Sequence, residues 1–297
     1  MIGELAALGA AISWTMSALF YRKALQTTKP ISANIVRLTC TGLVLLAFLA
    51  VSGKLGALTE LPANVIVLAC VSGIIGLGIG DTLYMMSLKN IGVARAVPIT
   101  CTYPLFNLLW AVFLVGEPVT FSVALGAIII VAGVWLLSRG EAANKAGTQG
   151  KTPLTGVVLA LATAILWSIS ITMINLAVRE TPDLDHALGI NTVRVMSIAF
   201  SLFIVSPVID RSFGFLKLDK KTVGVLIAGG IVALGLGWFF LAYSFVVTLE
   251  SRAVPISSTT PLFSTLVGIA LLHEKINAAN ALGSILIVAG IFLIFLI

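Results

Sequence analysis

Ten apolar runs of roughly helical length follow one another along this chain and leave it few ways to fold. A helix that crosses the hydrocarbon core of a bilayer needs about 20 predominantly apolar residues. Only 10% of the 297 residues are charged, whereas soluble domains carry about 25%. We therefore expect an all-α integral membrane protein with ten transmembrane helices. The runs cover approximately residues 2–21, 31–52, 62–88, 91–115, 120–138, 153–178, 187–209, 222–247, 250–272 and 277–297.

An internal duplication organises these runs. The Arg-Ala-Val-Pro-Ile motif at residues 95–99 returns at residues 252–256, and 12 of the 24 positions aligned from 95 and from 252 are identical. We predict a first five-helix repeat over residues 1–140, a linker over 141–151 and a second repeat over 152–297. Because five is an odd number, the second half enters the membrane from the opposite side, and the two halves are inverted repeats.

Basic residues indicate how the helices are oriented. The loops after the first, third, fifth, seventh and ninth runs hold 12 Lys and Arg residues, and the loops between hold 3. The positive-inside rule then places both termini outside. The net charge of +6 thus reflects membrane topology and does not suggest nucleic-acid binding. The expected location is the cell membrane, inner or plasma, as a multi-pass protein.

Polar residues at helical spacing mark the fourth helix of each half. Thr100, Tyr103, Asn107 and Trp110 follow the spacing i, i+3, i+7 and i+10, so they share one face of a continuous helix. Polar groups at this depth face other helices or a wet cavity. The alternatives are a substrate cavity and interhelical hydrogen bonding, and the symmetric placement favours the cavity. The polar counterparts in the second half are Ser257, Thr260 and Ser264.

Aromatic residues and prolines accompany the stripes. Trp14, Tyr84, Trp167 and Trp238 suit the wall of a substrate cavity, where they would stack on flat or cationic groups, or else the packing of the bundle. Four prolines kink the fourth helices and predict either a gating hinge or a static bend. These hinge or kink residues are Pro98, Pro104, Pro255 and Pro261.

Asp81 is the acid placed deep in a predicted span, and a carboxylate there is a functional hypothesis. We predict that it couples transport to protons or binds a cationic group. The alternatives are an acid that reaches the membrane interface and one that pairs with Arg95. The duplicated Arg37 and Arg194 are expected to cap helices, anchor at the interface or form ion pairs. The cavity would then carry few charges, which favours a neutral or zwitterionic solute.

Other chemistry has little support in the sequence. Cys40, Cys70 and Cys101 lie inside apolar runs and are expected to be core residues. The two histidines, His186 and His273, are far apart, so we expect no metal site. The glycine runs lack a preceding strand and predict close helix contacts rather than a nucleotide loop. We expect no catalytic residues and no cofactor, and hence not an enzyme.

The two five-helix halves, the tryptophan in the first helix of each and the proline-rich fourth helices that end in Gly116-Glu117 and His273-Glu274 resemble the EamA-type transporters of the drug/metabolite transporter superfamily. The resemblance covers nearly the whole chain. It implies a secondary active transporter, an exporter of a small organic metabolite, amino acid or drug-like solute, working by alternating access around a central midplane cavity. The implied partners are the solute, the lipid bilayer and protons, with no signal for an oligomeric state.

Two questions stay open at this point. The resemblance implies cytoplasmic termini, whereas the distribution of basic residues predicts outside termini. The alternative function is a non-transporting membrane scaffold or a receptor-like subunit, which predicts a dry and packed centre. An intramembrane enzyme is disfavoured, because the polar residues of the spans are mostly hydroxyls and amides.

Overall fold

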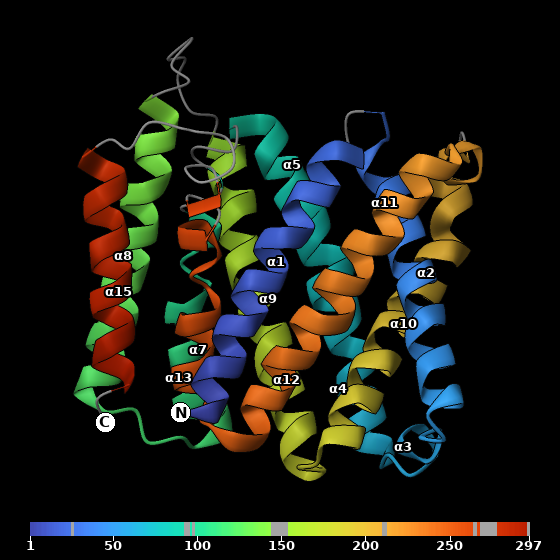
Figure 1. The fold of residues 1–297 in the computed structure, drawn as a ribbon, viewed down its shortest axis with the longest axis horizontal. Helices are drawn as coiled ribbons and strands as arrows, with labels where there is room; N and C mark the ends of the chain where they lie inside the picture. The colour runs from blue at the N-terminus through green and yellow to red at the C-terminus, as the bar shows by residue number, and fades with distance from the viewer. Residues whose placement is uncertain are drawn as a thin grey trace.

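Helices make up the architecture of the chain. The computed structural model describes residues 1–24, 27–91, 96, 99–143, 154–209, 213–263, 266–267 and 278–295. Every element assigned within these ranges is a helix. The helices stand side by side in one bundle, and the chain enters α1 and leaves α15 at the same end of it (Figure 1).

The first half runs from α1 to α8. Its third span is continuous but changes helix type, because a π-helical segment separates two α-helices. The elements are α1 (Ile2–Ala24), α2 (Pro30–Val51), α3 (Gly56–Thr59), α4 (Ala63–Ser72), the π-helix η1 (Gly73–Gly80), α5 (Asp81–Ile91), α7 (Tyr103–Trp110), the π-helix η2 (Ala111–Val115) and α8 (Phe121–Ala143).

The second half repeats this order, including a π-helix in the middle of its third span. The elements are α9 (Leu154–Glu180), α10 (Leu184–Ile209), the 3-10 helix η3 (Gly214–Lys217), α11 (Lys220–Gly230), the π-helix η4 (Ile231–Gly237), α12 (Trp238–Val247), α13 (Glu250–Ser257) and α15 (Ala278–Phe295). Asp219 caps α11 by accepting from the backbone N–H groups of Lys221 and Thr222. Hydrogen bonds from Thr222 hold the pKa of Asp219 below its ordinary value.

The predicted all-helical membrane architecture is confirmed at the level of helix content and apolar length. In the described part of the chain, 6 helices are long and apolar enough to cross a membrane. Shorter apolar helices cover Tyr103–Val115, Phe121–Leu136 and Ala281–Phe295. The number of ten spans and the inverted arrangement stay predictions. Most of the predicted linker, residues 144–151, lies outside the described residues.

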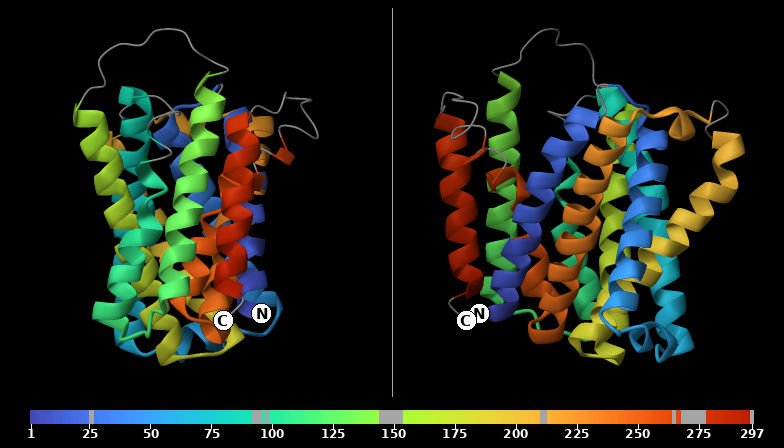
Figure 2. Two further views of the ribbon diagram at one scale, coloured as in Figure 1. Left: turned by 90° about the vertical axis from the view of Figure 1, so that its left-hand side faces the viewer. Right: turned by 45° about the vertical axis from the view of Figure 1, so that its right-hand side comes forward.

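The two halves interlock rather than lie side by side as separate bodies. Helix α1 packs against α11, η4 and α12 of the second half, and α9 packs against α4, η1 and α5 of the first. Each first helix also contacts the fourth helix of the other half, α1 with α13 and α9 with α7. In the right view of Figure 2, α1 (dark blue) passes between the α8–α15 pair and α11.

The last helices of the two halves, α8 and α15, form an extensively packed pair at one edge of the bundle (Figure 1). A Cβ atom on Gly126 would lie 2.8 Å from the carbonyl oxygen of Gly290, and one on Gly133 would lie 2.7 Å from that of Gly283. Gly126 and Gly283 are repeat counterparts, and so are Gly133 and Gly290. The predicted close contact through these glycines is confirmed.

The glycines of the third spans leave room for the two inner tryptophans. A Cβ atom on Gly80 would lie 2.9 Å from Cδ1 of Trp167, and one on Gly237 would lie 2.5 Å from Nε1 of Trp14. The absence of a side chain at these positions lets each indole lie against the backbone of the other half. The glycine pattern therefore sets the positions of the aromatic rings at the centre of the molecule.

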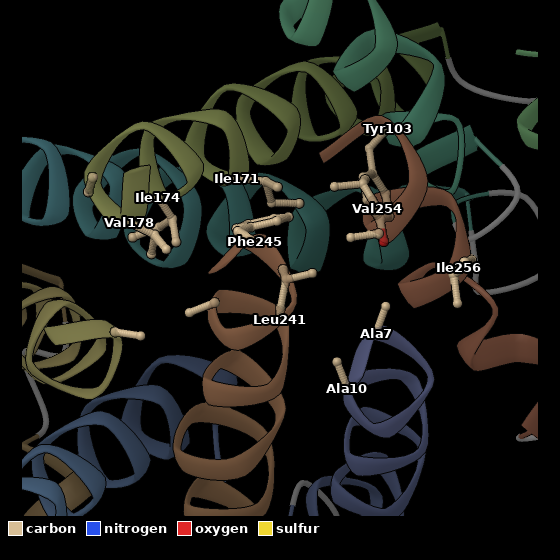
Figure 3. Close-up of a cluster of buried hydrophobic side chains, with 14 of the residues drawn as sticks. Ala7, Ala10, Tyr103, Ile171, Ile174, Val178, Leu241, Phe245, Val254 and Ile256 are labelled. Carbon is tan, nitrogen blue, oxygen red and sulfur yellow. The ribbon is translucent and has the colours of Figure 1, made fainter. Parts of the chain in front are cut away.

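A buried apolar cluster fills the bundle near the end that carries the first residues of α1. Figure 3 shows side chains of α1, α9, α12 and α13 turned toward one another, together with Tyr103 at the start of α7. Ala7 and Ala10 belong to this cluster, whereas Trp14 and Trp167 pack against it from farther along their helices.

Candidate functional site

A cavity of about 330 Å³ lies at the centre of the bundle and takes side chains from both halves. The first helices α1 and α9, the second helices α2 and α10 and the two π-helical third spans all contribute. The lining residues are Trp14, Ser17, Tyr21, Arg37, Gly76, Leu77, Asp81, Tyr84, Thr100, Cys101, Tyr103, Trp167, Ser170, Ile171, Arg194, Ala233, Leu234, Trp238, Ser258, Thr260 and Pro261.

Most of the sequence-predicted cavity residues are found in this lining. They are Trp14, Tyr84, Thr100, Tyr103, Trp167, Trp238 and Thr260, joined by Asp81 and by Pro261. Asn107, Trp110 and Ser257 are absent from the lining. Ser264 and Pro98 lie outside the described residues. Contact with a substrate stays a prediction for each of these positions.

The fourth helix of each half is broken where it reaches the cavity. Residues 101–102 form a turn between helical residues 99–100 and α7, and residues 258–259 form the corresponding turn after α13. Pro104 lies in the first turn of α7, and Pro255 lies inside α13. Next to the second break, the Thr15 hydroxyl donates to the carbonyl oxygen of Thr260 at 3.1 Å. The prolines thus accompany breaks, while a hinge function stays a prediction.

The predicted stripe divides in two between Tyr103 and Asn107, and not at the turn. Thr100 before the turn and Tyr103 after it both line the cavity, whereas Asn107 and Trp110 lie one and two turns farther along the continuous helix α7. Asn107 points instead to α9 and α13, where its Nδ2 donates to Glu250 Oε1 at 2.6 Å and to Thr172 Oγ1 at 3.1 Å. The Trp110 indole N–H donates to Ser168 Oγ at 2.8 Å.

Ser257 is also turned away from the cavity. Its hydroxyl donates to the carbonyl oxygen of Val254 at 2.9 Å, and the residue is fully buried. Asn107 and Trp110 thus take the interhelical hydrogen-bonding role that the sequence left as the alternative, whereas Ser257 bonds within its own helix.

The aromatic lining forms two ring groups, one around each inner tryptophan. The rings of Trp14 and Trp238 meet edge to face with centroids 5.4 Å apart. Trp167 lies 5.1 Å from the Tyr84 ring and 6.2 Å from the Tyr103 ring. Both indole N–H groups are satisfied, Trp14 by the Ala233 carbonyl at 3.2 Å and Trp167 by Asp81 Oδ1 at 3.0 Å.

Asp81 forms an ion pair in the cavity wall. Its Oδ2 accepts from Arg37 Nη2 at 2.7 Å, and the two side chains are 15% and 11% exposed. Asn34 Oδ1 accepts from Arg37 Nε at 2.6 Å and holds the guanidinium in place. The partner of Asp81 is therefore Arg37, and Arg95, the partner weighed from the sequence, lies outside the described residues.

Arg194 occupies the equivalent position of the second half, and no carboxylate of the described residues lies within ion-pair distance of it. Its Nε donates to Ser72 Oγ at 3.1 Å and its Nη2 to Ser170 Oγ at 2.9 Å. The guanidinium carbon lies 3.6 Å from the centroid of the Trp238 ring, a cation–π contact. Trp238 is the repeat counterpart of Asp81, so the two halves stabilise their arginines in different ways.

The cavity is more highly charged than the sequence analysis expected. Arg37, Asp81 and Arg194 all contribute to the lining. Of the structural roles expected for the two arginines, Arg37 takes the ion pair across helices. The feature of the sequence that could have placed these arginines in the cavity is the duplicated Asn-x-x-Arg spacing at residues 34–37 and 191–194. A polar side chain repeated at one depth in both halves points to the shared centre as readily as to two helix ends.

A second buried polar cluster lies beyond the cavity, at the start of α13. Glu250 is fully buried and accepts from Asn107, from Thr172 Oγ1 at 2.5 Å and from Asn175 Nδ2 at 2.6 Å. Glu117 accepts from the backbone N–H groups of Glu250 and Ser251, both at 2.9 Å, and forms an ion pair with Arg179. Sequence reasoning missed Glu250, since it stands at the edge of an apolar run.

Within the described residues, no group of three His, Cys, Asp or Glu side chains is arranged to hold a metal ion. The three cysteines are free and partly buried. The cavity itself offers aromatic faces, hydroxyls and fixed charges in a confined volume, which suit recognition of a small molecule.

Comparisons with known proteins agree with this architecture. The model of the EamA-like transporter family matches residues 1–139 and 154–296, which confirms the resemblance noted in the sequence. An uncharacterized transporter of Archaeoglobus fulgidus is 26% identical over 296 residues, an alignment that covers 100% of this chain and 99% of the relative. A crystal structure superimposes with a TM-score of 0.81 at 21% identity and covers 99% of this chain and 96% of the other, a likeness of fold.

Proposed function

Because this chain belongs to the EamA-like transporter family, we propose that it is a secondary active transporter that exports a small organic solute by alternating access around the central cavity. The observation that carries the proposal is the pair of broken fourth helices that meet at this cavity. Transporters commonly place discontinuous helices at their binding sites, because the freed backbone groups and helix ends can face a solute.

The inverted repeat that alternating access requires is supported by the α8–α15 pair. Gly126 faces Gly290, and Gly133 faces Gly283. Each contact is the repeat counterpart of the other, and the order of contacts is antiparallel, as expected for two helices related by a two-fold axis in the membrane plane. The reciprocal packing of α1 on α12 and of α9 on α5 supports the same relation.

Access must alternate between the two ends of the bundle. We propose that the apolar cluster around Ala7, Ala10 and Phe245, drawn in Figure 3, separates the cavity from the end that carries the start of α1. The Glu117–Arg179 pair and the Glu250 cluster lie farther toward that end. We propose that opening this end separates α13 from α9, and that the breaks at 101–102 and 258–259 act as the hinges.

Filling the cavity tests the transport function. Thr260→Trp adds an indole to the lining, and we expect it to lower solute flux by more than tenfold in proteoliposomes, since a site of about 330 Å³ cannot hold both the ring and a solute. The matched control is Leu282→Trp on the exposed face of α15, where the side chain is 52% exposed. The control should transport normally.

The screen that defines the flux uses a broad panel of neutral, zwitterionic and charged solutes, with and without a pH gradient. Absence of flux for every solute in the wild-type protein would refute the transporter and leave the scaffold or receptor-like alternative. Comparing right-side-out with inside-out vesicles then determines the direction, for which we propose export.

Proton coupling through Asp81 has its own test. We expect Asp81→Asn to remove the response of flux to an imposed pH gradient, because an amide cannot exchange the proton that would release Arg37 from the pair. Asp185→Asn is the matched control, since Asp185 forms an exposed ion pair with Lys54. A pH response that survives in Asp81→Asn and equals that of the control would disprove the coupling role.

A further inference from the structure

Arg194 is a buried cation that its neighbours do not neutralise. The residue is fully buried, yet among the described residues no carboxylate lies within ion-pair distance of it. Its Nε and Nη2 donate to the hydroxyls of Ser72 and Ser170, whereas its Nη1 finds no hydrogen-bond partner in the described part of the chain. A buried donor of a charged group without a partner is costly.

The acid of the cavity is committed elsewhere. Both carboxylate oxygens of Asp81 are engaged, Oδ2 by Arg37 and Oδ1 by the Trp167 indole. The charged groups of the lining are thus two guanidinium groups and one carboxylate. One positive charge, that of Arg194, is left in excess. Arginine retains its charge in proteins, so the excess does not disappear by deprotonation.

The surroundings of Arg194 suit an anion with an apolar body. Trp238 lies against one face of the guanidinium, and Trp14 packs edge to face on Trp238. The cavity volume of about 330 Å³, at roughly 30 Å³ for each water-sized group, corresponds to on the order of ten non-hydrogen atoms. A planar guanidinium binds carboxylates through parallel N–H donors, more specifically than a point charge does.

We propose that Arg194 determines the specificity of this site and that the solute is a small organic monocarboxylate with a flat or apolar body. The carboxylate accepts from Nη1 of Arg194, and its single charge brings the lining to neutrality. A zwitterion has no net charge and would not cancel the excess positive charge of the lining. A neutral solute would also lack an anionic group that could accept from Nη1. This inference rests on the proposed transport function and replaces the neutral or zwitterionic solute expected from the sequence.

The test compares isosteric ligands on the purified wild-type protein in nanodiscs. Phenylacetate and phenylacetamide have the same shape and differ in charge, and phenylalanine adds the ammonium group. Isothermal titration should give at least a tenfold tighter affinity for phenylacetate than for phenylacetamide or phenylalanine, the effect of a charge-assisted hydrogen bond in a desolvated site. Equal or weaker binding of phenylacetate in the wild-type protein would overturn the proposal without any variant.

Variants then assign the preference to Arg194. Arg194→Gln should reduce the acid-to-amide ratio to near one, while Arg194→Lys should retain part of it because the charge stays and the planar fork is lost. Lys54→Gln removes the same charge from an exposed ion pair and should keep the full ratio. A ratio that is unchanged in Arg194→Gln would overturn the assignment, and Arg194→Lys keeps it testable if the glutamine variant fails to fold.

Counterflow in proteoliposomes separates this inference from the transport function. Flux of phenylalanine or phenylacetamide without binding or flux of phenylacetate would support a transporter and overturn the monocarboxylate. Arg194-dependent binding of phenylacetate without flux of any solute would support the site and refute transport. Arg194-dependent binding together with phenylacetate flux would support both.

Discussion

Replacing Glu117 with alanine is expected to lower the free energy of unfolding by about 2 to 6 kcal/mol, because two buried backbone N–H donors lose their acceptor at about 1 to 3 kcal/mol each. Glu117 is 4% exposed, and its carboxylate caps the start of α13 through two backbone N–H groups while it pairs with Arg179. Alanine would leave these donors without an acceptor in the protein interior.

The apparent midpoint of thermal unfolding in detergent measures this effect. Glu60→Ala is the control, since Glu60 is 71% exposed and reaches His186 only at 4.0 Å, and surface pairs of this kind contribute little. The unfolding midpoint of Glu117→Gln should lie between those of Glu117→Ala and Glu60→Ala, because the amide oxygen of glutamine can still accept one hydrogen bond. Equal midpoints for Glu117→Ala and Glu60→Ala would contradict the role of Glu117 as the cap of α13.

Gly133→Leu is expected to have a second large effect by separating α8 from α15. A Cβ atom alone would lie 2.7 Å from the Gly283 carbonyl oxygen and 2.9 Å from the Ile287 backbone nitrogen. Backbone atoms cannot move aside as a flexible side chain can, so the helices must separate along their length. Overpacking costs about 1 to 3 kcal/mol for added methylene groups, and helices in a membrane depend on close packing for association.

A pair of alanine variants gives the sharper comparison. Gly133→Ala introduces the same Cβ atom without further bulk, whereas Gly224→Ala adds it to a helical position with nothing within 4 Å. Gly224→Ala should be neutral or slightly stabilising, since alanine is the better helix former by about 1 kcal/mol. If Gly133→Ala were equally harmless in thermal unfolding, the two helices would not be held by this contact.

The sequence was most informative where hydropathy and the duplication agree. The apolar run at 222–247 corresponds to α11, η4 and α12, and the run at 153–178 corresponds to α9. Both runs end within a few residues of the helices, because helix ends in a membrane protein follow the change from apolar to polar residues. The π-helical segments were not predictable in this way, since hydropathy does not distinguish helix types.

The site was predictable in part. Trp14, Trp167 and Thr260 reach the cavity as their position in the middle of the spans suggested. Asn107 does not, because helical spacing says which residues share a face and does not say where along α7 the cavity ends. An ion pair was among the roles expected of Arg37 and is found with Asp81, but the sequence does not reveal which partner stands beside each arginine.

The exchange of first helices between the halves has a consequence for synthesis. Helix α1 packs on α12, which the ribosome reaches after roughly 200 further residues, on the order of ten to forty seconds later at 5–20 residues per second. Among the described elements, the extensive contacts of α1 are all with the second half. We therefore expect α1 to reach its final packing only after α12 has been made, and a first half expressed by itself should be degraded faster than the full chain in a pulse-chase experiment.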